Sequence, residues 1–170
     1  MSTLTKTQID FRQAMANLAA AVNIVTTDGP HGKLGITVSA VCSFTDDPPT
    51  LIVCVNRSSA AHDVFAANGT VAINVLSSDQ EELARHFSGA TKIPMEERFA
   101  WDIWERGAEA PLLKDARVAI VGKVKTMLTR GTHSAMFVEV ETVRTSDGSG
   151  GLVYDNRTFH PVKVAQAAGA

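Results

Sequence analysis

The sequence has few cysteines, no long apolar run and no signal-like start. Its 170 residues include two cysteines, Cys42 and Cys54, which lie in apolar segments and form no CxxC pair. A disulfide framework needs more cysteines, so we predict free thiols in a reducing compartment. No stretch approaches the roughly 18 apolar residues of a membrane-spanning helix, and the polar segment 1–10 lacks the pattern of a signal peptide. We therefore expect a cytoplasmic protein with no membrane partner.

Positive charge is not in excess either. Sixteen Lys and Arg residues face eighteen Asp and Glu residues, which gives a formal net charge of −2. Nucleic-acid binding depends on a basic surface. We therefore predict no nucleic-acid partner.

Several familiar catalytic motifs are missing as well. Gly29, Gly32 and Gly35 lack G-x-G-x-x-G spacing, and there is no P-loop, HExxH or G-x-S-x-G sequence. A Rossmann dehydrogenase, a P-loop NTPase, a zincin and an α/β-hydrolase are therefore disfavoured. The histidines are scattered rather than grouped at ligand spacing, so we expect no metal site; they are His31, His62, His86, His133 and His160.

The length and composition predict one globular domain over residues 1–170, with a core at about 11–162. Phe11, Met15 and Leu18 recur at helical spacing, and Thr7 with Asp10 resembles a capping box before them. A second helix is predicted over 58–67. A third is predicted to begin at a capping box of Ser78 and Glu81 and to end at Phe87. Residues 88–110 are expected to form a loop with at most one helical turn.

Alternating apolar and polar residues predict the strands. The expected strands are 21–27, 33–45, 50–55, 70–76, 117–128 and 134–144, with a possible last strand at 151–159. Their close spacing favours an antiparallel barrel with flanking helices over repeated βαβ units.

Two segments could bind a ligand. Asn56, Ser58 and Ser59 follow a buried strand and open a helix, where backbone N–H groups and hydroxyls suit a phosphate. Taken by itself, the segment favours ordinary helix capping by Ser58 or Ser59. The strand 35–43 has one small, hydroxyl-bearing face that would let a flat ring approach its backbone. A half-exposed strand with a polar solvent face shows the same pattern.

Taken in order along the chain, these segments resemble the flavin reductase family, and within it the reductase components of the 4-hydroxyphenylacetate 3-monooxygenase type. The segments that carry the resemblance to the family are residues 21–27, 35–43, 47–51, 74–76, 84–87 and 131–133. The resemblance to the 4-hydroxyphenylacetate 3-monooxygenase type is carried by residues 95–99 and 159–162. The resemblance implies an antiparallel split β-barrel of Greek-key type that binds FMN or FAD. In many members Asp stands where this chain has Thr132.

The resemblance also implies an activity and partners. It implies an NAD(P)H:flavin oxidoreductase in which hydride passes from NADH, or possibly NADPH, to FAD or FMN, and reduced flavin leaves for a separate oxygenase. A homodimer with flavin near its interface is implied too, and we expect Phe137, Trp101 and Trp104 to be exposed for that contact or packed in the core. The alternatives are a storage or sensing protein that holds flavin without turnover, and a pyridoxamine phosphate oxidase.

By the same resemblance, the cofactor-binding residues are Thr37, Val38, Ser39, Ala40, Cys42, Ser43, Asn56, Ser58, Ser59, Arg85, His86, Phe87, His133, Tyr154, Arg157 and Phe159. His133 would also be the catalytic residue, positioning the nicotinamide without transferring a proton. His133 could instead be a plain hairpin residue, and Arg85 a surface charge paired with Glu81 or Glu82. Tyr154, Arg157 and Phe159 could be strand-edge packing, and both cysteines could be core residues.

Overall fold

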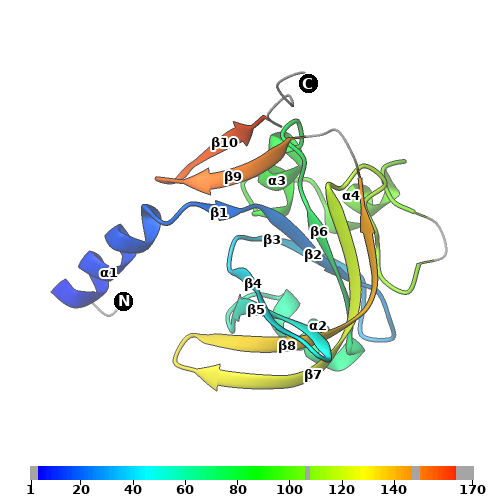
Figure 1. The fold of residues 1–170 in the computed structure, drawn as a ribbon, viewed down its shortest axis with the longest axis horizontal. Coiled ribbons are helices and arrows are strands. Elements are labelled where there is room, and N and C mark those ends of the chain that lie inside the picture. Colours follow the sequence, from blue (N-terminus) through cyan, green and yellow to red (C-terminus); the bar gives the residue numbers. More distant parts are fainter. Residues whose placement is uncertain (1–3, 106–107, 147–149, 164–170) are drawn as a thin grey trace, which may run out of the picture.

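The computed structural model describes residues 4–105, 108–146 and 150–163. Its helices are α1 (Lys6–Ala16), α2 (Ala61–Asn68), α3 (Glu81–Phe87) and α4 (Met95–Ala100). Within the described ranges no helix is long and apolar enough to span a membrane. Figure 1 shows α1 projecting from the body of the molecule, whereas α3 and α4 lie against the sheet.

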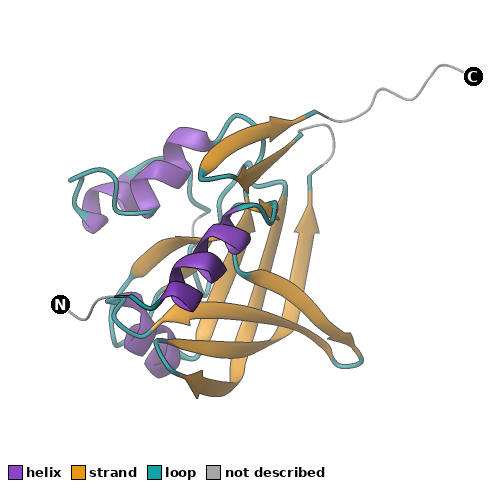
Figure 2. Ribbon diagram, turned by 90° about the vertical axis from the view of Figure 1, so that its left-hand side faces the viewer, coloured by secondary structure: helices purple, strands orange, loops and turns teal. Residues whose placement is uncertain are grey.

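Antiparallel strands form the bulk of the fold, as expected. They are β1 (Ala20–Ala21), β2 (Asn23–Thr27), β3 (Leu34–Val38), β4 (Val41–Asp46), β5 (Pro49–Asn56), β6 (Thr70–Val75), β7 (Val118–Arg130), β8 (His133–Thr145), β9 (Gly151–Asp155) and β10 (Thr158–Val162). Seven of them form one sheet in the order β3-β2-β6-β7-β8-β5-β4, and β1-β9-β10 form a small second sheet. Figure 2 shows the large sheet curving round on itself.

The prediction of a single strand over 33–45 is wrong, because the strand is interrupted at Ser39 and Ala40. Before the break, β3 pairs with β2; after it, β4 pairs with β5. The two halves therefore lie at opposite edges of the seven-stranded sheet. One sequence pattern of period two continues across the gap, so alternation alone could not reveal that the pairing partner changes.

Two large apolar clusters make up most of the core. The first lies inside the barrel and includes Val25, Val53, Phe65 and Met136. The second lies under α3, α4 and β9, and includes Trp104. Trp104 is 7% exposed and its indole N–H donates to the Arg98 carbonyl at 2.8 Å. The tryptophans are therefore not exposed contact residues: Trp101 packs partly buried against the same cluster.

The helix termini differ from the predicted ones. The first helix ends at Ala16, before Leu18, and its capping box is formed by Thr5 and Gln8 instead of Thr7 and Asp10. The predicted box of Ser78 and Glu81 is also wrong, since α3 begins after Gln80 without a side-chain cap. Residues 18–22 have helical spacing in the sequence, but the pairing of β1 with β9 and of β2 with β3 overrides it.

Two tight hairpins differ from the prediction: one shortens the expected connection at 129–133, and the other replaces the single strand expected at 151–159. β7 and β8 pair through Arg130 and His133, so the turn is Gly131-Thr132, with Gly131 at φ 57°. The predicted last strand is a hairpin of β9 and β10, whose turn residues Asn156 and Arg157 have φ of 45° and 62°. Positive φ at both central residues is the geometry of a two-residue hairpin turn.

Candidate functional site

A cavity opens where β3 breaks. The barrel-mouth cavity encloses about 360 Å³ and is lined by Ile36, Thr37, Val38, Ser39, Ala40, Cys54, Val55, Asn56, Ser59, Phe87, Ser88 and His133. Eight of the predicted site residues meet here: Thr37, Val38, Ser39, Ala40, Asn56, Ser59, Phe87 and His133. Small side chains at Ser39, Ala40, Ser59 and Ser88 leave room for a flat ring over the strand break.

One side of this cavity is the turn between β5 and α2. The Asn56 Oδ1 accepts from the Ser58 N–H at 3.0 Å and from the Ser58 hydroxyl at 2.9 Å. The Ser59 hydroxyl accepts from the Ala61 N–H at 3.3 Å. The helix begins later than predicted, and neither serine is its N-cap residue. The turn therefore presents amide and hydroxyl groups, which suit an anionic oxygen.

His133 belongs to the neighbouring hairpin turn. It is exposed, faces Asn56 in the register of β5 and β8, and its Nδ1 lies 2.9 Å from the Thr132 hydroxyl. The Arg57 backbone N–H donates to the Thr132 carbonyl at 2.9 Å, and its guanidinium donates to the Gly131 carbonyl at 3.2 Å. We call residues 56–59 together with 131–133 the barrel wall. Hydrogen bonds from the backbone and the side chain of Arg57 hold its two turns against each other.

A second cavity adjoins the first along β3. The hairpin cavity encloses about 400 Å³ and is lined by Val22, Thr37, Ser39, Arg85, Ser88, Tyr154, Arg157, Thr158 and Phe159. It shares Thr37, Ser39 and Ser88 with the barrel-mouth cavity. The predicted C-terminal residues thus come next to the predicted strand, although more than a hundred positions separate them in the sequence.

Ring contacts hold the outer side of the hairpin cavity. The Tyr154 and Phe159 rings lie 5.0 Å apart between centroids, and the Arg85 guanidinium lies 5.2 Å from the Phe159 centroid. Arg85 also pairs with Glu81 at 2.6 Å, as the plainer interpretation predicted, but it lines the cavity as well. We call Arg85 with residues 154–159 the hairpin wall. Arg157 occupies the left-handed region, which is unfavourable for a side chain other than glycine.

Four predicted residues line neither cavity. Cys42 and Ser43 lie exposed on β4, beyond the strand break. Ser58 supports the turn through Asn56. His86 points to the other side of α3, where its Nδ1 lies 3.0 Å from the Thr91 hydroxyl and its ring lies 5.1 Å from that of Trp101.

Sequence reasoning missed several lining residues, of which Cys54 is the most informative. It was expected in the core, yet it lines the barrel-mouth cavity two residues before Asn56. Residues two apart on a strand share a face, so the spacing could have found it. Burial, with a smaller contribution from Cys42, raises the pKa of the Cys54 thiol. The thiol is therefore a weak nucleophile at neutral pH.

The two cavities together suit a particular chemistry. They meet at a stretch of small residues, and donor groups lie at either end: Asn56 and Ser59 on one side, Arg85 and Arg157 on the other. Guanidinium and hydroxyl donors suit phosphates, and the small residues between them suit stacked planar rings. Within the described ranges no group of three or more His, Cys, Asp or Glu residues could hold a metal ion. The arrangement fits two phosphorylated ligands with flat rings in contact.

Comparisons with known proteins agree with this geometry. Residues 15–163 match the model of the flavin reductase like domain. The chain is 47% identical over 169 residues to the 4-hydroxyphenylacetate 3-monooxygenase reductase component of Pseudomonas aeruginosa, covering 99% of each chain. It is 47% identical to an FMN reductase (NADH) of Pseudomonas syringae, over 90% of this chain and 85% of that one.

A solved structure gives the same result for the fold. The flavin reductase component of a bacterial two-component tryptophan halogenase superposes with a TM-score of 0.85 at 26% identity, covering 92% of this chain and 98% of the other. The split-barrel architecture predicted from the sequence is therefore confirmed.

Proposed function

The chain belongs to the flavin reductase like family, and we propose that its two adjoining cavities bind flavin and a nicotinamide dinucleotide in ring-to-ring contact. The protein is a flavin reductase that transfers hydride from NADH to FAD or FMN, of the kind that serves a two-component monooxygenase. The observation that carries the assignment of the site is the shared boundary at Thr37, Ser39 and Ser88, which places the two ligands next to each other.

The flavin belongs in the barrel-mouth cavity. Ser39 and Ala40 lie exposed at the strand break, where small side chains let a ring approach the backbone. Asn56 and Ser59 lie at one end of this cavity and would bind a flavin phosphate, while Arg85 would reach the same ligand from the hairpin wall. When bound, the flavin accepts the hydride that the nicotinamide donates.

His133 is assigned to the nicotinamide. It is exposed at the rim of the barrel-mouth cavity, and its contact with the Thr132 hydroxyl orients the ring. Hydride transfer needs the reacting atoms at about 3–3.5 Å, so a residue that fixes the position of one ring raises the rate without transferring a proton. Tyr154 and Phe159 would cover the nicotinamide from the hairpin wall.

The test is NADH oxidation by flavin-stripped protein, with FAD, FMN or no flavin added. Turnover that requires added flavin and saturates with its concentration is the expected result, and it ranks the two flavins. Repeating the assay with NADPH ranks the two nucleotides. Flavin binding without turnover would indicate a storage or sensing protein, and no flavin binding would contradict the site itself.

The assignment of His133 is tested separately. We expect His133→Ala to raise the KM for NADH by about tenfold and the flavin dissociation constant by much less, because the side chain lies exposed at the rim of the flavin cavity. His133→Asn, which keeps a hydrogen-bonding group, is expected to raise the KM for NADH less than His133→Ala does. An unchanged KM in His133→Ala would contradict the role.

Partners follow from the same function. A reductase of this type supplies reduced flavin to a separate oxygenase component, and we propose one for this chain with an aromatic substrate of the 4-hydroxyphenylacetate kind. We also propose that it works in the cytoplasm, where its two free cysteines remain reduced.

A homodimer is proposed from the exposed surface. No residue of α1 is buried, and Ile9, Phe11 and Met15 are 54%, 62% and 46% exposed. An isolated helix of 11 residues is marginal in water, so packing of α1 against a second copy would stabilise it. Phe44 adds an exposed ring on β4, where it meets the partly buried Phe137 at 5.1 Å between centroids. Sedimentation as a single chain at micromolar concentration would contradict the dimer.

A further inference from the structure

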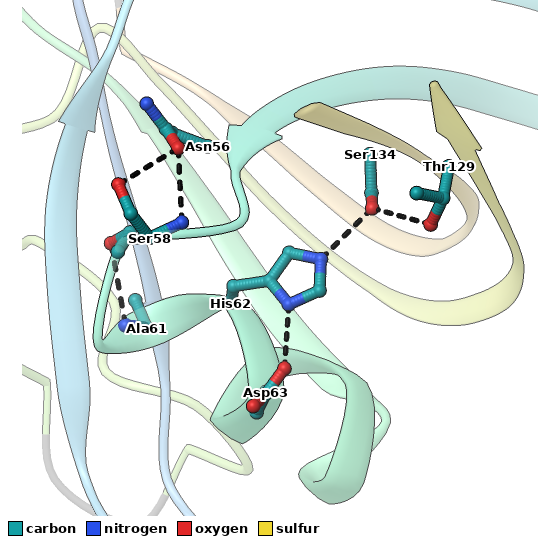
Figure 3. Close-up of polar contacts among 8 residues, drawn as sticks. Asn56, Ser58, Ala61, His62, Asp63, Thr129 and Ser134 are labelled. Atoms are coloured by element: carbon teal, nitrogen blue, oxygen red, sulfur yellow. Dashed lines mark hydrogen bonds and ion pairs between the residues drawn. The ribbon is translucent and has the colours of Figure 1, made fainter. Parts of the chain in front are cut away.

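We propose that His62 is a positioning residue that sets the place of His133 through the buried hydroxyl of Ser134; this inference rests on the proposed function. Figure 3 shows the side chain of His62, on α2, pointing toward Ser134 at the start of β8. Its Nε2 lies 2.9 Å from the Ser134 Oγ, and that oxygen lies 2.9 Å from the Thr129 hydroxyl on β7. Hydrogen bonds among three side chains thus join α2 to both β7 and β8.

The direction of these hydrogen bonds follows from Asp63. Its carboxylate lies 2.6 Å from the His62 Nδ1, which therefore carries the proton that it donates. In the neutral ring the Nε2 then accepts from the Ser134 hydroxyl, which in turn accepts from Thr129. If the ring is protonated, both bonds reverse their direction and remain intact. The link therefore persists whichever charge His62 carries.

Burial makes the link rigid. Ser134 is 0% exposed, and the His62 side chain is 13% exposed. A buried hydroxyl without a partner is destabilising, so the serine is restrained to this geometry. By contrast, the Arg57 guanidinium contacts the same hairpin turn from an exposed position, where water competes for the bond. The contact of His62 with Ser134 is thus a side-chain link, protected from water, between the elements that follow the two turns of the barrel wall.

The link lies next to the two parts of the site that the proposed function assigns to ligands. His133 is the direct neighbour of Ser134 and faces Asn56 across the strands. His62 follows the proposed phosphate turn by three residues, counted from Ser59. The link therefore restrains the distance between the flavin-binding turn and the nicotinamide-binding histidine. A small shift in that distance matters because hydride transfer depends steeply on the alignment of the reacting atoms.

The link resembles a serine–histidine–aspartate arrangement, but it cannot act as a nucleophilic centre. Ser134 lies inside the barrel with no exposed surface, so no substrate carbonyl can reach its oxygen. Asp63 is the residue adjacent to His62 and its side chain is 96% exposed. The geometry supports a positional role alone.

The experiment is a double-mutant cycle on the full-length protein, with flavin binding and NADH kinetics measured for each variant. His62→Ala is expected to raise the KM for NADH by about fivefold and to change the flavin dissociation constant less than about twofold, with His62→Gln restoring part of the loss. In the His133→Ala background, His62→Ala should raise the KM for NADH further by less than about twofold, because the effects of residues that act through one another are not additive. His31→Ala, at an exposed histidine that lines neither cavity, is the matched control.

The outcomes separate this inference from the proposed function. If His133→Ala leaves the KM unchanged, the proposed role of His133 is wrong. If His133→Ala raises it but His62→Ala does not, or if the two effects multiply, the positioning role is overturned. Should His62→Ala fail to fold, Ser134→Ala removes the same link with the loss of one buried oxygen. The positioning role then requires that Ser134→Ala raise the KM for NADH, and that its effect not multiply with that of His133→Ala.

Discussion

The two walls of the site differ in the contacts that complete them beyond the pairing of their strands. In the barrel wall, the turns at 56–59 and 131–133 are joined by hydrogen bonds from the backbone N–H and the guanidinium of Arg57. Next to them, the buried contact of His62 with Ser134 joins α2 to β8. In the hairpin wall, the tilted rings of Tyr154 and Phe159 lie 5.0 Å apart between centroids, and the Arg85 guanidinium lies 5.2 Å from the Phe159 centroid. Hydrogen bonds are directional and permit little displacement, whereas contacts between rings tolerate sliding.

That difference matches what the reaction requires of each wall. On the proposed assignment, the barrel wall holds the reacting rings at a defined separation. The hairpin wall covers the nicotinamide that binds and leaves in each turnover, so a looser set of contacts suits it. Substitutions on the barrel wall should therefore be more costly than those on the hairpin wall.

The largest effect is expected at Asn56. Asn56→Ala removes the acceptor of two hydrogen bonds from Ser58, and we predict that the flavin dissociation constant rises by about tenfold, since their net value is roughly 1–1.5 kcal/mol. Asn56→Asp keeps the acceptor oxygens and adds a negative charge. If the turn binds phosphate, the aspartate variant should bind FMN more weakly than the alanine variant. Restored binding by aspartate would mean that Asn56 only shapes the turn.

A smaller effect is expected at Phe159 on the hairpin wall. Phe159→Ala removes the ring that contacts Tyr154 and the Arg85 guanidinium. We predict an increase of about fivefold in the KM for NADH, because such a cation–π contact is worth roughly 0.5–1 kcal/mol and part of the covering surface is also lost. Phe159→Leu keeps the apolar volume and should lie between alanine and the native protein. A loss of flavin binding equal to that in Asn56→Ala would remove the distinction between the walls.

Arg157 separates stability from binding. Its φ of 62° favours glycine, so Arg157→Gly should raise the free energy of unfolding by up to about 1 kcal/mol, measured by urea denaturation. The same change removes a guanidinium from the hairpin cavity. We expect the KM for NADH to rise by about threefold. A variant that gains stability without any change in nucleotide kinetics would show that Arg157 serves only the turn.

The smallest effect concerns the rate of cysteine alkylation. Cys42 is exposed, whereas Cys54 is partly buried and its pKa is raised by burial. Iodoacetamide should therefore modify Cys42 first, with Cys54 reacting only slowly until the pH is well above neutral, because the thiolate is the reactive form. In Cys42→Ser protein, added FMN should slow the remaining reaction further. Equal rates with and without flavin would place the ring away from Cys54.

Part of the site could be predicted because its residues lie in continuous segments. Thr37, Ser39 and Ala40 line the cavity at the end of a strand that their alternation predicted. His86 shares a short helix with Arg85 and Phe87, yet it points to the opposite side toward Thr91. Membership of a motif did not determine which way each side chain faces, because successive residues of a helix point in different directions.

Local patterns along the chain predicted most of the strands, the helix that ends at Asn68 and the antiparallel class. Those features depend on the residue period and on a few backbone conformations, which neighbours in sequence decide. Only the tertiary structure decided that residues 33–45 divide between two sheet edges, that the indole of Trp104 is buried, and that His62 meets Ser134. These depend on which distant strands pair when the barrel closes, and a period of two is the same for every partner.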